Sequence, residues 1–226
     1  MKTREIQYQS QVSLKDTKGL TPLGIKTNDT WHIDPKRLLF SLARYKFVAK
    51  MLSGKNKVLE VGCGDAFCTR IVLQEVKALC AIDFDPIFIG DIQERMEDKW
   101  GFETKVHDIL LGPLEKKFDA VYSLDVLEHI PEEKEDLYMK NICRSIIESG
   151  VFIIGTPSFN SQVYASQNSK IGHINCKDGD GLRRLMGRYF HNIFIFSMND
   201  EVVHTGFYPM AQYLFGMGVG NKIGGG

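Results

Sequence analysis

Apolar runs and amphipathic stretches alternate along most of the chain. Continuous apolar runs bounded by turn residues predict buried strands, and apolar residues at helical spacing predict helices. The first predicted strand begins at residue 58, and the next four cover 78–83, 103–107, 118–124 and 151–156. Helical patterns cover 36–52, 88–100, 132–148 and 181–190. Strands that alternate with helices are typical of an α/β fold with a mainly parallel sheet.

Two further β-rich runs close the predicted sheet, at 192–197 and 202–207. Only four residues join them, and such a short connection requires antiparallel neighbours. The 226 residues fit one α/β domain. We therefore expect a single doubly wound sheet of seven strands, mostly parallel with an antiparallel last strand, and helices on both faces.

The first predicted strand runs directly into a glycine turn, Gly62-Cys63-Gly64, and a helical pattern opens at Asp65. Glycines let a ligand approach the backbone, and a helix N-terminus offers free N–H groups, so this segment predicts a nucleotide cradle. A dinucleotide fingerprint would place a third glycine at position 67, where Phe67 stands. The pattern therefore indicates an adenosine ligand without phosphates.

The second predicted strand ends in Asp83, which lies 21 residues beyond Gly62. That spacing is close to the ~20 residues expected for a ribose-binding acid. A carboxylate accepts hydrogen bonds from both ribose hydroxyls, which favours this role. The alternative is a helix cap, and we assign that role to Asp85, which precedes Pro86.

The glycine turn and its surroundings resemble the class I S-adenosylmethionine-dependent methyltransferases, whose first motif reads Asp/Glu-x-Gly-x-Gly-x-Gly. Here the motif is Glu60-x-Gly62-x-Gly64-x-Ala66, with alanine in place of the last glycine. The resemblance runs from about residue 40 to about residue 207 and implies a Rossmann-like fold and the cofactor S-adenosylmethionine. The cofactor-binding residues that it implies are Glu60, Gly62, Cys63, Gly64, Asp83, Phe84, Asp108, Ile109 and Leu124.

The resemblance also assigns roles to some of these residues and to the helix before the motif. Asp108 would bind the adenine amino group, while the backbone N–H of Ile109 would meet the ring. A loop aspartate is the alternative for Asp108. Arg44 or Tyr45 is a candidate for the methionine carboxylate, and a solvated arginine and a core tyrosine are the alternatives.

The fourth predicted strand is followed by Leu127-Glu128-His129-Ile130-Pro131, the form of the fourth motif found in many small-molecule methyltransferases. A hydroxyl acceptor needs its proton removed during methyl transfer. Asp125 and His129 follow the fourth strand, and His173 lies in a long polar segment, 157–177, that we interpret as a substrate loop. These three residues are the catalytic candidates.

A metal site is a further hypothesis. Asp125, Glu128, His129 and His173 resemble the Glu-x-x-Glu-His…His arrangement of metal-assisted methyltransferases, including ubiquinone-pathway O-methyltransferases and small-RNA 2′-O-methyltransferases. That resemblance implies Mg²⁺ or Mn²⁺. Asp125 replaces the usual glutamate and shortens one ligand. The alternative, found in metal-free relatives, is that Glu128 caps the next helix and His129 acts alone.

Composition narrows the function classes. Lys and Arg number 28, as do Asp and Glu, and this neutral balance argues against a nucleic-acid substrate. The five cysteines include no Cys-x-x-Cys pair, which favours reduced thiols. No signal peptide or membrane-spanning run is evident, so we expect a cytoplasmic location. Arg183, Arg184 and Arg188 indicate a solvated helix face or, alternatively, contacts with a phosphorylated substrate.

We expect an N-terminal arm or lid over 1–35, a methyltransferase domain over 36–208, and a tail over 209–226 that packs on a neighbouring subunit or frays. The expected activity is methyl transfer to a hydroxyl of a small acceptor, first of all a sugar or nucleotide-linked sugar in carbohydrate biosynthesis. RNA 2′-O-methylation, N-methylation and an inactive cofactor-binding partner subunit are the alternatives. A homodimer is a further expectation.

Overall fold

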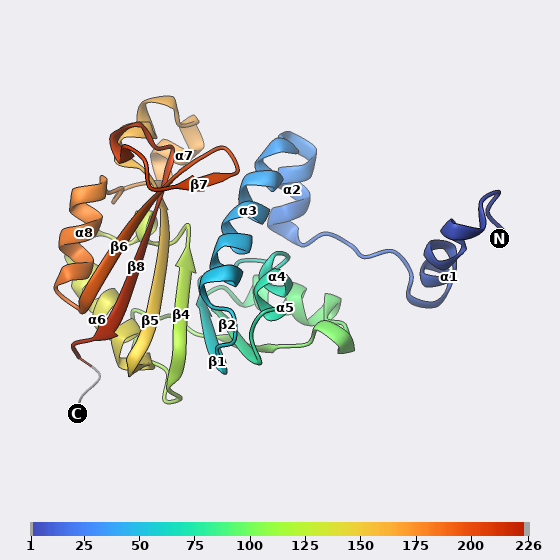
Figure 1. Ribbon diagram of the computed structural model, residues 1–226, viewed down its shortest axis with the longest axis horizontal. Helices are drawn as coiled ribbons and strands as arrows, with labels where there is room; N and C mark the ends of the chain where they lie inside the picture. Colours follow the sequence, from blue (N-terminus) through green and yellow to red (C-terminus); the bar gives the residue numbers. More distant parts are fainter. Residues whose placement is uncertain (1, 224–226) are drawn as a thin grey trace.

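One sheet of eight strands organises the molecule, in a computed structural model that describes residues 2–223 (Figure 1). The strands are β1 (Lys57–Val61), β2 (Ala78–Asp83), β3 (Glu103–Val106), β4 (Phe118–Leu124), β5 (Ile146–Pro157), β6 (Phe190–Asn199), β7 (Val202–His204) and β8 (Tyr213–Asn221). The helices are α1 (Gln9–Lys18), α2 (Ile25–Ile33), α3 (Lys36–Met51), α4 (Thr69–Leu73), α5 (Pro86–Arg95), α6 (Glu135–Ser145), α7 (Gln167–Gly172) and α8 (Gly179–Gly187).

The strand order is β3-β2-β1-β4-β5-β8-β6-β7. The first five strands in this order pair in parallel, whereas β8 is antiparallel to both β5 and β6, and β7 is antiparallel to β6. The predicted fold class is confirmed. The predicted count of seven strands is wrong, because the described residues form an eighth strand near the C-terminus.

The additional strand, β8, lies inside the sheet, so the predicted domain boundary at 208 and the tail that was to fray or pack elsewhere are wrong. A Cβ at Gly216 would lie 2.3 Å from Sδ of Met186, and one at Gly218 would lie 2.5 Å from Cγ of Phe190. These glycines are therefore needed for close packing, although their abundance suggested a flexible tail. Residues 224–226 of the predicted tail lie outside the described residues.

Successive residues of the central strands pack into two separate cores, one on each face of the sheet. Leu59, Val121 and Phe152 belong to the core covered by α6 and α8. Val58 and Ala120 point the other way, into the core covered by α3, α4 and α5. Helices on both faces leave the carboxyl-terminal edge of the parallel strands as the place for a ligand.

The helix after the glycine turn begins later than the sequence predicts, at Thr69 rather than Asp65. Gly64 and Ala66 have φ angles of +53° and +48°. A right-handed helix excludes such positive angles, so residues 63–68 form turns instead. The cradle is consequently built from loop backbone, with only a short helix behind it.

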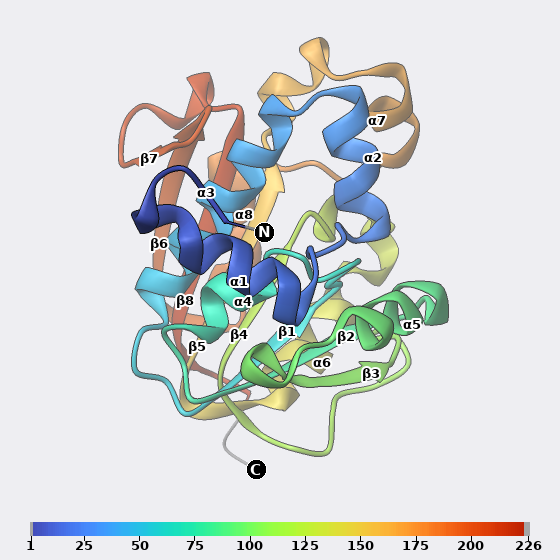
Figure 2. The same ribbon diagram turned by 90° about the vertical axis from the view of Figure 1, so that its right-hand side faces the viewer.

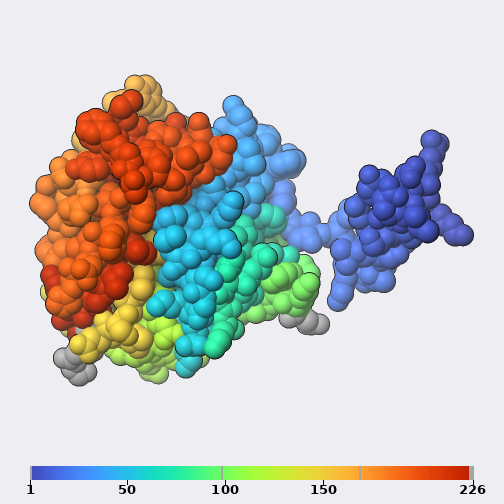
Figure 3. Space-filling model, viewed as in Figure 1, coloured from blue at the N-terminus to red at the C-terminus, as the bar shows by residue number. Residues whose placement is uncertain are grey.

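The N-terminal segment divides into two parts (Figures 1 and 3). α1 buries no residue and stands away from the rest of the molecule on an extended segment. α2 lies beside α3 at the edge of the sheet that holds the ends of the parallel strands (Figure 2). Asp65 anchors α2, because its carboxylate accepts hydrogen bonds from the backbone N–H of Thr27 at 2.6 Å and from its hydroxyl at 3.2 Å. None of the helices among the described residues has the length and apolar character needed to span a bilayer.

Candidate active site

A cavity of about 620 Å³ opens where β1, β2 and β4 end. The residues that line it are Lys26, Val61, Gly62, Gly64, Asp83, Phe84, Phe88, His107, Asp108, Ile109, Leu110, Asp125, Val126, His129, Ile130 and Pro131. Of the predicted cofactor-binding residues, six line this cavity: Gly62, Gly64, Asp83, Phe84, Asp108 and Ile109. Of the predicted catalytic residues, Asp125 and His129 line it.

Gly62 forms the tightest part of the cradle. Its φ is +74°, and a Cβ there would lie 2.3 Å from Cγ2 of Val126. Its backbone N–H donates to the carbonyl of Ile82 at 2.9 Å. Both the backbone angle and the neighbouring side chain therefore require glycine at this position.

Asp83 is fixed at the end of β2 by the backbone. One carboxylate oxygen accepts from the N–H of Gly64 at 2.9 Å, and the other accepts from the N–H of Asp85 at 3.0 Å. Asp85 in turn accepts from Ile87 N, so the predicted cap of α5 is confirmed. Asp83 is held rigidly at the cavity wall, where its remaining lone pairs are available to a ligand.

The third strand contributes the opposite end of the cavity. Asp108 folds its carboxylate back onto the N–H of Leu110 at 2.8 Å, which fixes the turn after β3. Phe84 and Phe88 add aromatic surface to the lining. The helical pattern over 88–100 predicts a longer helix, but α5 ends at Arg95, and Phe88 lines the cavity. With these two aromatic rings and the carboxylate of Asp108, this end of the cavity fits a flat apolar ring of a ligand that has polar groups at its edge.

Glu60 does not line the cavity, although the resemblance implied that it binds the cofactor. Its side chain is buried and accepts hydrogen bonds from the hydroxyls of Tyr45 at 2.6 Å, Thr69 at 2.6 Å and Tyr122 at 2.7 Å. Burial raises its pKa to about 7, against the opposing effect of these three donors. Glu60 therefore joins α3, α4 and β4 to β1 and positions the glycine loop.

Cys63 and Leu124 also lie outside the main cavity. They line a smaller cavity of about 50 Å³ behind the glycine loop, together with Lys26 and Tyr45. The backbone N–H of Cys63 bonds to the Ile82 carbonyl at 3.0 Å. These residues shape the loop from behind.

Arg44 binds Asp125, a contact between residues 81 positions apart in the chain. Nη1 lies 3.0 Å and 2.8 Å from the two carboxylate oxygens, and the guanidinium lies 3.8 Å from the ring centre of Tyr213. Burial opposes ionisation of Asp125, but Arg44 and Lys26 outweigh it and lower its pKa. The candidate roles of Arg44 and Tyr45 at the methionine carboxylate are therefore not supported, because each is bound to a carboxylate of the protein.

Three of the four predicted metal ligands lie together: Glu128, His129 and His173 each offer a ligand atom within 4.8 Å of the others. The two imidazole rings have centroids 5.4 Å apart. Two backbone bonds hold the histidines side by side, because the carbonyl of Glu128 accepts from the N–H groups of Ile174 at 2.8 Å and Asn175 at 3.0 Å. Asp125 is not part of this group and is bound to Arg44 instead.

Hydrogen bonds fix which nitrogen each histidine presents. Nδ1 of His129 lies 2.9 Å from the carbonyl oxygen of Gly172, and Nδ1 of His173 lies 2.9 Å from Oε1 of Gln162. Both partners are acceptors, so each Nδ1 donates and each Nε2 keeps its lone pair. Burial and the neighbouring His129 lower the pKa of His173, which favours the neutral, ligating form.

Glu128 fits a cation. Its Oε1 is buried without a hydrogen-bond partner among the described residues, while Oε2 accepts from the Thr156 hydroxyl at 3.2 Å. Burial and the charge of Asp125 raise the pKa of Glu128 to about 8. A buried carboxylate beside two imidazole lone pairs is a donor set that a divalent ion would satisfy.

Residues 58–150 match a protein family described as a methyltransferase domain. The chain is similar in structure to the N-methyltransferase NodS from Bradyrhizobium japonicum WM9 in complex with S-adenosyl-L-homocysteine, with 17% identity, a TM-score of 0.60, and coverage of 96% of this chain and 99% of NodS. The DhpI complex with SAH is 14% identical, with a TM-score of 0.64, and the match covers 95% of this chain and 97% of DhpI. The methyltransferase domain of bacterial CtHen1-C is 12% identical, with a TM-score of 0.65, and the match covers 80% of this chain and 99% of that domain. No curated protein sequence matches the chain.

The strand order, the glycine loop and the fixed acid at the end of β2 define an adenosine-binding α/β fold of the class I methyltransferase type. The family match shows that residues 58–150 form a methyltransferase domain, and S-adenosylmethionine is the cofactor that fits this domain and fold. The 620 Å³ cavity, lined by the glycine loop and Asp83, is called the cofactor cavity below.

Proposed function

We propose that this methyltransferase transfers the methyl group to a hydroxyl of a small acceptor, with a sugar or nucleotide-linked sugar as the first candidate. The observation that supports this proposal is the convergence of Glu128, His129 and His173 beside the cofactor cavity. Amine acceptors need no such group, whereas a hydroxyl must lose a proton. Two neighbouring hydroxyls, as in a sugar, suit a cluster with several ligand atoms.

Glu128, His129 and His173 would hold Mg²⁺ or Mn²⁺, while Asp125 is reserved for Arg44. A divalent ion at this position supplies Lewis acidity that lowers the pKa of a bound hydroxyl. The Nδ1 contacts to Gly172 and Gln162 fix the orientation of both imidazoles. The chain itself thereby aligns the ligand atoms before acceptor binding.

The residues that line the cavities have to bind the cofactor and the acceptor. The cofactor supplies a methyl group already activated on sulfonium, so the protein has to align donor and acceptor and exclude water. Asp83 and Asp108 line the cofactor cavity, and in this proposal Asp83 binds the ribose and Asp108 binds the adenine. The segment 157–177 walls a second cavity of about 720 Å³ that includes His173, and we propose that this cavity receives the acceptor.

Chelation tests the proposal directly. Nucleotide sugars and small polyols are screened with S-adenosylmethionine, and the new methyl group is located by mass spectrometry. We expect EDTA to abolish transfer and Mg²⁺ or Mn²⁺ to restore it. His129→Ala should lower turnover by about 10²-fold or more and leave the Kd for S-adenosylhomocysteine unchanged, because its ring packs against His173, which lines the proposed acceptor cavity.

The outcomes separate the alternatives. Full activity in EDTA on an amine acceptor would establish N-methylation, the activity after which the N-methyltransferase NodS is named. Cofactor binding without transfer to any acceptor would favour an inactive partner subunit. Methylation of an RNA 3′ end would support the RNA alternative, against the neutral charge of the chain. The cytoplasmic location and the homodimer remain predictions.

A further inference from the structure

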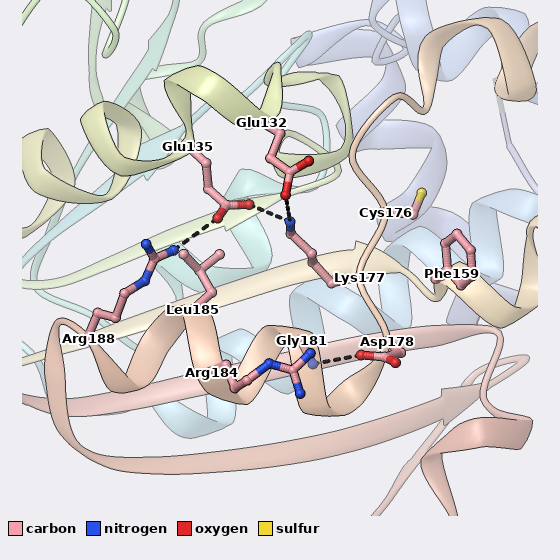
Figure 4. A pocket seen from close by; sticks show the side chains of 10 residues that line it. All are labelled: Glu132, Glu135, Phe159, Cys176, Lys177, Asp178, Gly181, Arg184, Leu185 and Arg188. Carbon is pink, nitrogen blue, oxygen red and sulfur yellow. Dashed lines mark hydrogen bonds and ion pairs between the residues drawn. The ribbon is translucent and has the colours of Figure 1, made fainter.

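The 720 Å³ cavity, which we propose receives the acceptor and call the acceptor cavity, continues into another cavity farther from the cofactor cavity. This further cavity measures about 420 Å³ and lies between α8, the start of α6 and the segment after β5 (Figure 4). Glu132, Phe159, Cys176 and Lys177 line both cavities. The two form one groove, which runs from His173 to α8, and its far part is called the distal cavity.

The distal cavity has a polar lining of three cations and three carboxylates. The buried carboxylate of Glu135 forms ion pairs with Lys177 at 2.7 Å and with Arg188 at 3.1 Å. Asp178 caps α8 and accepts from the N–H of Gly181 at 2.6 Å. Glu132 lies at the rim with 84% of its side chain exposed. The carboxylates inside the cavity are therefore already bound.

Arg184 differs from the other two cations. Its side chain extends from α8 along the cavity wall, and it makes no hydrogen bond or ion pair with any residue in the described range 2–223 (Figure 4). A guanidinium offers five donors in a planar fork that matches a phosphate group. The neighbouring Arg183 is different again, since it donates to the carbonyl of Ile193 at 3.2 Å and does not line the cavity.

We propose that the distal cavity binds a phosphoryl group of the acceptor through Arg184, so that the methylated hydroxyl reaches the histidine pair from the far end of the groove. This inference rests on the proposed function and narrows its substrate class to phosphorylated acceptors, such as a nucleotide-linked sugar. Binding energy from this remote group would orient the hydroxyl.

Cys176 gives a direct readout because it lines both cavities and is half-buried, whereas the other four cysteines are buried. Burial raises the pKa of its thiol to about 11, so alkylation by iodoacetamide is followed at pH 9. EDTA is present throughout, which keeps a divalent ion from holding the anion. Inorganic pyrophosphate and uridine diphosphate are the probes.

We expect saturating pyrophosphate to slow alkylation of Cys176 at least fivefold, because it covers the thiol. Arg184→Gln should raise the concentration needed for half protection by about tenfold, the loss expected for one charge-assisted contact. Arg183→Gln on the same helix should behave as the unsubstituted protein. Unchanged binding of S-adenosylhomocysteine by Arg184→Gln shows that the variant is folded.

Failure of both probes to protect Cys176, or equal protection in Arg184→Gln and the unsubstituted protein, would overturn the proposal. Protection by uridine diphosphate alone would assign the site to a nucleotide, and protection by both probes would assign it to the phosphoryl group. The labelling requires no methyl transfer. Protection that depends on Arg184 in a protein that methylates only amines would therefore contradict the proposed function and leave the phosphoryl site intact.

Discussion

Glu60 is a buried carboxylate surrounded by three hydroxyl donors and by no cation among residues 2–223. Its raised pKa means that the folded state holds the proton more tightly than the unfolded state. Its contribution to stability is then complete below pH 4.5 and is lost as the pH rises toward 7. The loss is on the order of 3 kcal/mol.

Glu60→Gln isolates this effect, because the amide stays neutral at every pH. We expect the free energy of unfolding of the unsubstituted protein to fall relative to that of Glu60→Gln as the pH rises from 4.5 to 8. Urea unfolding at several pH values measures the two free energies. Parallel pH profiles for the two proteins would show that Glu60 is not responsible.

Single residues also show what a sequence can and cannot reveal. The spacing from Gly62 predicts that Asp83 lies at the ligand site, because a β-α-β unit fixes that distance along the chain, and Asp83 lines the cofactor cavity. Arg44 and Asp125 are far apart in the chain, and no periodicity connects them. Asp125 was therefore interpreted as a metal ligand, when its carboxylate is bound to Arg44.

At the scale of elements, α2 places Lys26 at the cofactor cavity beside Gly64 and Asp125. The ammonium group of Lys26 forms no hydrogen bond or ion pair with any residue that the structure describes. With Arg44 bound to Asp125, this ammonium is the cation available for the carboxylate of the methionine part of the cofactor. The sequence offered no signal for it, because α2 lies in a polar stretch.

Lys26→Gln tests this role. We expect the Kd for S-adenosylhomocysteine to rise about tenfold and the Kd for methylthioadenosine, which lacks the amino-acid part, to stay unchanged. Lys36→Gln, an exposed lysine at the start of α3, serves as the control. Calorimetric titration gives all the constants. Equal losses for both compounds would mean that Lys26 supports the loop and does not bind the carboxylate.

At the scale of the whole molecule, the mainly parallel sheet and both helical layers follow from the alternation of apolar runs, because parallel strands need helical crossovers. β8 escaped that reasoning. Its glycines replace bulky residues where β8 meets Met186 and Phe190, so the segment lacks the composition of a strand. Sequence patterns report burial of large side chains and miss strands buried through close backbone approach.

Two deletions test the importance of β8. Removing residues 213–226 leaves β5 and β6 without the strand that pairs with both, and exposes the contacts of Leu214 and Phe215. The expected loss exceeds about 5 kcal/mol, enough to abolish folding. Removing residues 2–18 takes away no buried side chain and should leave the Tm unchanged. Circular dichroism on heating compares them, and a folded protein without β8 would contradict this topology.

The carbonyl of Glu128 receives two main-chain hydrogen bonds from the segment that also forms the floor of the acceptor groove. One stretch of backbone thus delivers His173 to its partners and shapes the space for the acceptor. If the cluster holds an ion and the groove holds an acceptor, as proposed, occupancy of either place would stabilise the same arrangement, and each would strengthen the binding of the other by an equal factor. Release of the product would then weaken the binding of the ion.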